Sequence, residues 1–293
     1  VRTGGSAQAS EIYSIGLNPG EGVIQISEGG ISQTVVFEDV LAVRDNVPAA
    51  SFTVNGTSAN DTITFAAGVG GGIFTGTTGK IAVDNSDSIE FNNKASLTIN
   101  GMAGSDAINL NHPSAPLGLT SITVNGGDPS SAEGDRLHLQ SAGSILPSAA
   151  GGGTIVAPGL PSIAFSGIEV ATVAGFTVVP TVDGLEVTAT GDRNFAGQDD
   201  AFIIDTDAIS QFLTLTLNGS IALYAGRAAI AGISASGLAG NDSLTLTGTA
   251  NGDTFNFSPA TEDTGIVSIA GGITIDYASI DLIVLNGLGG DDT

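Results

Sequence analysis

The stretch Gly101-Met-Ala-Gly-Ser-Asp106-Ala-Ile108-Asn-Leu110 contains the pattern that decides the fold of this 293-residue chain. A glycine is followed five residues later by an aspartate, and the aspartate leads apolar residues that stand two positions apart. Apolar residues at every second position are typical of a β-strand with one buried face. The stretch therefore predicts a tight turn, a carboxylate and a short strand.

The same pattern recurs along the chain. Its six complete copies place an aspartate before an alternating strand at Asp61, Asp106, Asp135, Asp200, Asp242 and Asp253, and a seventh copy begins at Asp292. The glycine lies five residues before the aspartate in most copies and nine before it in two, and an asparagine often precedes the glycine, as in Asn55-Gly56. The repeated unit is a strand, an Asn-Gly turn, a carboxylate and a second strand.

This repeat predicts an all-β protein, either an irregular parallel β-helix (β-solenoid) or tandem antiparallel β-sandwiches. A solenoid is favoured because a repeat of this size buries its apolar face only against its neighbours. The sandwich stays open because Asn-Gly between alternating strands is also a hairpin signal. We expect an N-terminal β segment over 1–50, a repeat block over 51–140, a Gly/Ser/Pro-rich loop over 141–161, and a second block over 162–293 that continues beyond 293.

Composition limits the partners. Thirty acidic residues face seven basic ones, which gives a net charge of -23. Nucleic-acid binding needs clusters of Lys and Arg that this chain lacks, and an anionic membrane surface would repel it. With 41% apolar and only 13% charged residues the chain has enough apolar surface to fold. We expect neither a nucleic-acid partner nor membrane insertion.

Two copies of the motif resemble a known family. Gly237-Leu-Ala-Gly240-Asn-Asp242-Ser-Leu244 and Gly287-Leu-Gly-Gly290-Asp-Asp292 look like single copies of the haemolysin-type (RTX) calcium-binding nonapeptide. The larger pattern is similar to repeats of very large bacterial surface proteins, which implies an extracellular or cell-surface location. Successive motif aspartates are 45, 29, 65, 42, 11 and 39 residues apart, so a uniform roll of stacked nonapeptides is excluded.

The resemblance and the acidic turns together predict bound Ca²⁺. Calcium takes six to eight oxygen ligands, and backbone carbonyls of a tight turn with one aspartate supply part of such a shell. The alternative is that each aspartate only caps its own turn through the backbone. The predicted metal ligands are Asp61, Asp106, Asp135, Asp200, Asp242, Asp253, Asp291 and Asp292.

Catalytic constellations are sparse in the sequence. His112 and His138 are the only imidazoles, and neither a nucleophile elbow nor a phosphate-binding loop occurs. We therefore expect no enzyme, but a structural surface, filament or lattice protein, stabilised by calcium, that associates with itself head to tail. The alternatives are an adhesive module that binds a cell-surface glycan and a polysaccharide-active β-helix enzyme.

Overall fold

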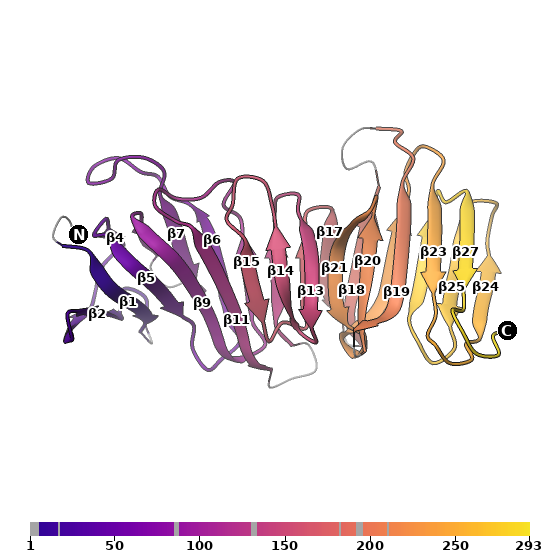
Figure 1. Ribbon diagram of the computed structural model, residues 1–293, viewed down its shortest axis with the longest axis horizontal. Coiled ribbons are helices and arrows are strands. Elements are labelled where there is room, and N and C mark those ends of the chain that lie inside the picture. Colours follow the sequence, from indigo (N-terminus) through magenta and orange to yellow (C-terminus); the bar gives the residue numbers. More distant parts are fainter. Residues whose placement is uncertain are drawn as a thin grey trace. The chain divides into compact units, whose positions relative to one another are not determined.

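A computed structural model describes residues 6–16, 18–84, 88–129, 134–181, 183–191, 196–209 and 211–293. The chain divides into two compact units. The first contains residues 1–141 and 152–168, and the second contains residues 142–151 and 169–293. Strands dominate both units, and one short 3-10 helix is present, so the predicted all-β class is confirmed (Figure 1).

The first unit is built on two sheets. The strands of its first sheet, in spatial order, are β14 (Gly152–Val156), β15 (Ile163–Ser166), β11 (Ser121–Pro129), β9 (Lys94–Gly104), β5 (Ala49–Asn55), β1 (Gln8–Ile15), β2 (Gly22–Glu28) and β3 (Ile31–Phe37). Those of the second sheet are β12 (Arg136–Leu139), β10 (Ala107–Leu110), β6 (Thr62–Ala67), β7 (Gly79–Val83), β8 (Ile89–Phe91) and β4 (Val43–Asp45).

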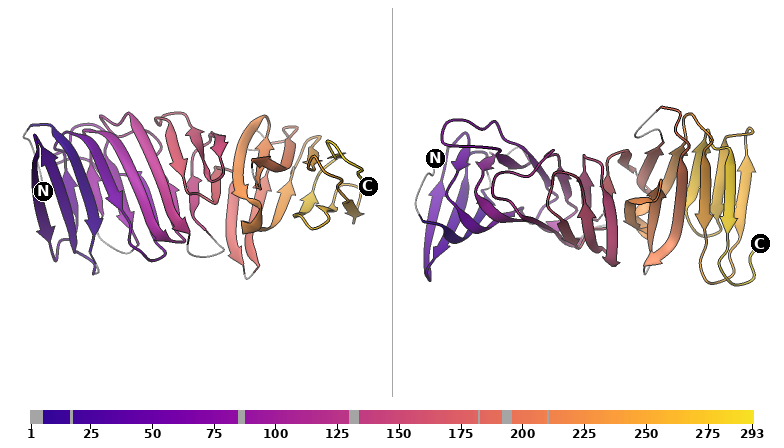
Figure 2. Two further views of the ribbon diagram at one scale, coloured as in Figure 1. Left: turned by 60° about the horizontal axis from the view of Figure 1, so that its bottom comes forward. Right: turned by 45° about the horizontal axis from the view of Figure 1, so that its top comes forward.

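The motif strands of this unit pair in parallel. The strands that precede a motif turn, β5, β9 and β11, lie side by side in parallel register, flanked by β1 and β15 (Figure 2, left). The strands that follow the aspartate, β6, β10 and β12, form a second parallel ladder. Hairpins do not give parallel neighbours, so the motif strands are not arranged as in the antiparallel alternative. Antiparallel strands such as β2, β3 and β7 make the sheets mixed.

The second unit repeats this plan. One sheet contains β27 (Leu282–Asn286), β23 (Ser243–Thr247), β19 (Ala201–Ile209), β20 (Phe212–Leu217), β21 (Ser220–Gly226) and β16 (Val170–Val173). The other contains β17 (Phe176–Thr181), β18 (Gly184–Thr190), β22 (Ile230–Ser236), β26 (Thr274–Ala278), β25 (Gly265–Ile269) and β24 (Phe255–Pro259). The strands β18, β22 and β26 are parallel to one another, and so are β19, β23 and β27. The 3-10 turn η1 (Arg227–Ala229) precedes β22.

The core lies between the two sheets of each unit. In the first unit the inward residues of the motif strands are almost fully buried, as Leu97, Ile99 and Ile108 illustrate. The ring centroids of Phe52 on β5 and Phe91 on β8 are 4.8 Å apart, so the two sheets are in direct contact. The segment 141–161, expected as a loop, contains β14 and also β13 (Ser144–Ala149), which belongs to the second unit.

Candidate functional site: the aspartate turns and the uncharged face

The motif aspartates are joined to one another by hydrogen bonds. The backbone N–H of Asp61 donates to Oδ1 of Asp106 at 2.8 Å, and the N–H of Asp106 donates to Oδ1 of Asp135 at 2.8 Å. Each carboxylate thus holds the backbone of the preceding repeat. We call this chain of contacts an aspartate ladder.

The second unit contains two further ladders. In one, the N–H of Asp200 donates to Oδ1 of Asp242, and the N–H of Asp242 donates to Oδ2 of Asp281. In the other, the N–H of Asp253 donates to Oδ1 of Asp292 at 2.9 Å. Asp242 directly precedes β23 and Asp253 follows it, so the short spacing between them reflects one strand with a ladder turn at each end.

The motif glycine is required because its aspartate occupies the space of a Cβ atom. A Cβ on Gly56 would lie 2.6 Å from Oδ2 of Asp61, and one on Gly101 would overlap both Oδ2 of Asp106 and the carbonyl oxygen of Gly126. The same overlap with the partner carboxylate arises at Gly191, Gly237, Gly248 and Gly287. The fixed Gly-to-Asp spacing therefore has a steric cause. The enlarged segments 130–133 and 192–195 lie outside the described residues.

The five turns with a five-residue spacing between glycine and aspartate fall into two kinds. After Gly56 and Gly248 stands a threonine whose N–H donates to Oδ2 of the aspartate, at 2.6 Å for Thr57 and 2.7 Å for Thr249. After Gly101, Gly237 and Gly287 stands Met102, Leu238 or Leu288 with a positive φ of 89°, 72° and 63° respectively. A left-handed backbone is unfavourable for such side chains. In the two threonine turns, the residue after the glycine therefore donates to the second carboxylate oxygen.

The carboxyl group of Asp106, in the turn that contains Met102, lies in an unfavourable environment for a negative charge. Its side chain is fully buried, and Oδ2 has no hydrogen-bond partner among the described residues. Burial raises the pKa of this carboxyl group, the hydrogen bond from the Asp61 backbone opposes that effect, and the charge of Asp84 adds to it. Burial also raises the pKa of Asp61, against the lowering effect of the hydrogen bonds from Thr57.

These contacts bear on the predicted calcium ligands. Asp61, Asp106, Asp135, Asp200, Asp242 and Asp253 are buried in the ladders, whereas Asp291 and Asp292 are exposed. Within the described ranges no group of three or more His, Asp or Glu side chains has the geometry to hold a metal ion. Bound Ca²⁺ at these aspartates stays a prediction. Asp281, which follows Ile280, is a ladder member that the sequence motif missed.

The two histidines belong to no such group within the described residues. His112 is buried, its Nε2 is 2.9 Å from the carbonyl oxygen of Thr78, and its ring is 5.0 Å from that of Phe65. Burial lowers the pKa of His112 and of the half-buried His138.

None of the described segments forms a helix with the length and apolarity of a membrane span.

A second candidate site is the outer face of the parallel strands in the first unit. Three strands carry the same sequence, Ser-x-Thr-x-Asn-Gly, beginning at Ser51, Ser96 and Ser121. Parallel pairing aligns the copies residue by residue, so serines, threonines and asparagines form three columns across the sheet. The asparagine column is hydrogen-bonded: the Nδ2 of Asn125 donates to Oδ1 of Asn100, whose Nδ2 donates to Oδ1 of Asn55, each at 2.8 Å. We call this surface the uncharged face.

The other sheet of the same repeats lacks this uniformity. Its aligned outward residues include Thr62, Ala107 and Arg136 in one column and Thr64, Asn109 and His138 in the next. β-Propensity alone explains outward Ser and Thr on either sheet. Within these repeats, the outward residues are identical from strand to strand on the first sheet and differ on the second. This identity distinguishes the uncharged face.

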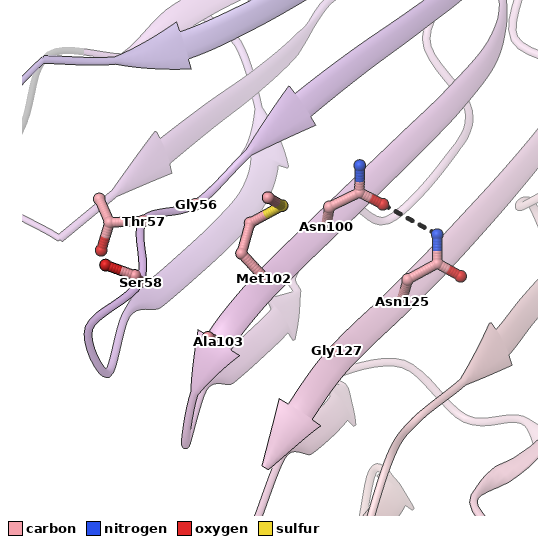
Figure 3. Close-up of a pocket in the computed structure, with 8 residues that line it drawn as sticks. All are labelled: Gly56, Thr57, Ser58, Asn100, Met102, Ala103, Asn125 and Gly127. Atoms are coloured by element: carbon pink, nitrogen blue, oxygen red, sulfur yellow. Dashed lines mark hydrogen bonds between the residues drawn. The ribbon is translucent and has the colours of Figure 1, made fainter. Parts of the chain in front are cut away.

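A pocket of about 390 Å³ lies where the uncharged face meets the motif turns (Figure 3). Figure 3 shows Met102 between the turn that contains Thr57 and Ser58 and the hydrogen-bonded pair Asn100 and Asn125. The remaining lining residues are Gly56, Ala103 and Gly127.

Compared with family models, curated proteins and solved structures, the chain matches none.

Proposed function

We propose that this chain is a structural repeat protein of the extracellular or cell-surface kind, in which the paired motif strands are coils of an irregular β-solenoid. The aspartate ladders carry this proposal. They place carboxylates, the chemically most versatile groups of the chain, in the interior, where they join one repeat to the next. Acidic groups used in this way stabilise an elongating stack of repeats and are not displayed to a substrate.

Self-association at open strand edges extends the proposal. Among the described strands β27 pairs only with β23, and Leu282 and Val284 on it are 57% and 40% exposed. β3 pairs only with β2, and Ile31 and Val36 are 75% and 65% exposed. An unpaired edge with exposed apolar side chains is a template for another strand. A second copy of this chain is the proposed occupant, which gives head-to-tail assembly.

Light scattering and electron microscopy test the assembly. We expect species larger than a monomer that dissociate in the double variant Leu282→Lys/Val284→Lys, because charges on an edge strand oppose pairing. Ile203→Lys is the matched control, since Ile203 is 40% exposed on β19, which has a neighbour on each side. A wild-type chain that stays monomeric at high concentration would contradict the proposal.

Calcium stabilisation stays a prediction, and it rests on the exposed acids of the turns and on the net charge of -23. Asp199, Asp291 and Asp292 are solvent-facing, and Asp199 also accepts a hydrogen bond from the N–H of Asn241. Ca²⁺ at a hundredfold excess over its Kd would add about 2.7 kcal/mol per site to the free energy of unfolding. Thermal melts with calcium and with chelator measure this, and superimposable melts would leave capping as the only role.

Adhesion to a neutral glycan is the second candidate, and the uncharged face with its pocket favours it. A pocket of this volume is within the range for small-molecule ligands. Asn100 uses one amide N–H and one lone pair in its column, which leaves one of each for a ligand hydroxyl. Microarrays of neutral oligosaccharides test this, with Asn100→Leu expected to abolish binding and Asn109→Leu, on the other sheet, expected to leave it unchanged.

We further propose that the chain catalyses no polysaccharide cleavage. Incubation with a glycan panel, followed by assays for reducing sugars and for unsaturated uronates, measures this. Product release that disappears when one carboxylate is replaced would contradict the proposal and favour the enzymatic alternative.

A further inference from the structure

The first unit encloses a lysine between two carboxylates. Lys94 opens β9, and its ammonium Nζ is 2.6 Å from Oε2 of Glu11 on β1 and 3.4 Å from Oδ1 of Asp45 on β4. All three side chains are buried, with exposures of 0%, 0% and 1%. The chain has only two lysines among its 293 residues, and one of them is enclosed here.

The surroundings of the three groups are largely apolar. The Phe52 ring centroid lies 5.7 Å from Nζ, and the Phe91 ring is 4.8 Å from that of Phe52. The Val47 carbonyl accepts a hydrogen bond from Nζ at 2.5 Å. The Val47 N–H donates to Oδ1 of Asp45 at 2.9 Å, so this oxygen already faces a backbone donor.

The burial of these charged groups is unfavourable in free energy. The Lys94 ammonium contacts both carboxylates, and buried charges are unfavourable unless they are paired or a proton neutralises them. When one proton is taken up, the cluster contains an ammonium, one carboxylic acid and one carboxylate. These are the reactants for an amide bond, held together in a buried site, and enforced proximity of this kind accelerates intramolecular reactions by orders of magnitude.

We propose that Lys94 and Asp45 form an intramolecular isopeptide bond, with Glu11 as the catalytic base. Glu11 accepts one proton from the Lys94 ammonium, and the free amine attacks Cγ of protonated Asp45. The Val47 N–H stabilises the negative charge that develops on Oδ1. The C–N bond forms and the Cγ–Oδ2 bond breaks. The Oδ2 hydroxyl leaves as water after receiving the second amine proton, and Glu11 remains protonated.

The roles follow from the contacts. Glu11 makes the shorter contact with Nζ, which suits proton transfer, whereas Asp45 has the backbone donor that an electrophilic carboxyl group needs. The bond would join β4 to β9 across 49 residues of chain and would replace buried charges by a neutral amide. This inference does not depend on the proposed assembly, because the three residues lie within one unit of one chain.

Mass spectrometry of the denatured full-length chain tests the bond. We expect an intact mass that is lower than the sequence mass by one water molecule, and a proteolytic fragment in which Lys94 is joined to Asp45. Glu11→Gln keeps the size of the side chain but removes the base, so the folded variant is expected to show the full sequence mass. Lys80→Gln, which changes the other lysine, is expected to keep the loss of water.

Three results would overturn the proposal. They are an unreduced mass in the wild-type chain, a cross-link that joins Lys94 to Glu11, and complete loss of water in folded Glu11→Gln. Circular dichroism reports whether that variant folds. Should it fail to fold, the wild-type mass and the mapped fragment decide the question alone.

Discussion

The backbone N–H of Asp61 donates a 2.8 Å hydrogen bond to the carboxylate of Asp106, which lies 45 residues later in the chain. This contact is repeated between Asp106 and Asp135, where the separation is only 29 residues. The alignment of neighbouring repeats is therefore independent of the length of chain between them. It depends on the carboxylate, on the backbone donor and on the glycine that makes room for both.

Replacement of the motif glycine should be strongly destabilising. In Gly101→Ala the added methyl group would overlap the Asp106 carboxylate and the Gly126 carbonyl oxygen, so the turn must shift. Overpacking of this kind costs about 1–3 kcal/mol. Denaturant unfolding measures the loss, and Gly289→Ala is the control because its nearest neighbour would be 3.7 Å away. Equal stability of the two variants would contradict the steric role of Gly101.

The charge of Asp106 should make stability depend on pH. Burial raises the pKa of Asp106 in the folded protein above its ordinary value of 3.8, so the folded state binds this proton more tightly than the unfolded chain does. The contribution of Asp106 to the free energy of unfolding is therefore greatest below that ordinary value and falls as the pH rises through the folded-state pKa.

Asp106→Asn tests this dependence. The amide oxygen can still accept the hydrogen bond from Asp61, while the buried negative charge is removed. We expect the variant to be more stable than the wild type at pH 7 by about 1 kcal/mol, the scale of a buried unsatisfied group. Its stability should also change less between pH 4 and pH 7. Asp128→Asn, at an exposed position, should leave the pH profile unchanged. A variant with the wild-type profile would count against a charged Asp106.

The asparagine column should contribute to stability through its side chains. Asn100→Ala removes two hydrogen bonds, one to Asn55 and one from Asn125. At about 1 kcal/mol for each bond, the free energy of unfolding should fall by about 2 kcal/mol. Asn109→Ala, at an outward position of the other sheet, should have a much smaller effect. Thermal and denaturant unfolding compare the two variants, and similar losses would show that the column is not stabilising.

Replacement of a left-handed leucine by glycine should stabilise the protein. Leu238 has a φ of 72° and a side chain that is 52% exposed, so little packing is lost on its removal. Leu238→Gly should therefore raise the free energy of unfolding by about 1 kcal/mol, the cost of a left-handed conformation for an L-residue. Thr57→Gly is the opposite case and should be destabilising, because it keeps the N–H donor but removes the hydroxyl that donates to Oδ1 of Asp61. A destabilised Leu238→Gly would show that its side chain is needed.

The sequence was sufficient to predict the local pattern of this fold. Alternating residues after five of the aspartates form β6, β10, β12, β19 and β23 as expected, and inward apolar positions such as Ile63 and Leu244 are fully buried. The sixth copy, after Asp253, forms β24, but its apolar face is not buried: Phe257 is 50% exposed. The Ala-rich run from 225 to 239 forms no α-helix, since its glycines are unfavourable in a helix. It contains the single turn η1 and the strand β22.

Contacts between residues distant in the chain could not be predicted in the same way. Nothing near Lys94 in the sequence indicates Glu11, which is 83 residues earlier, or Asp45 on another strand. The parallel pairing likewise depends on chain segments of variable length between the repeats. The three Ser-x-Thr-x-Asn-Gly copies were visible in the sequence, but only the strand register shows that they form columns on one face.

The aspartate ladders also decide where this chain can accept new sequence. The carboxylate of a ladder aspartate, and not a fixed spacing, aligns each repeat with the next. The chain segment between two successive ladder aspartates is therefore free to change in length. The β7–β8 pair lies in one such interval, and the next interval contains a shorter connection. The intervals are natural points of insertion for foreign loops, binding peptides or whole domains, and a search that assumes a constant repeat length will overlook proteins built on the same principle.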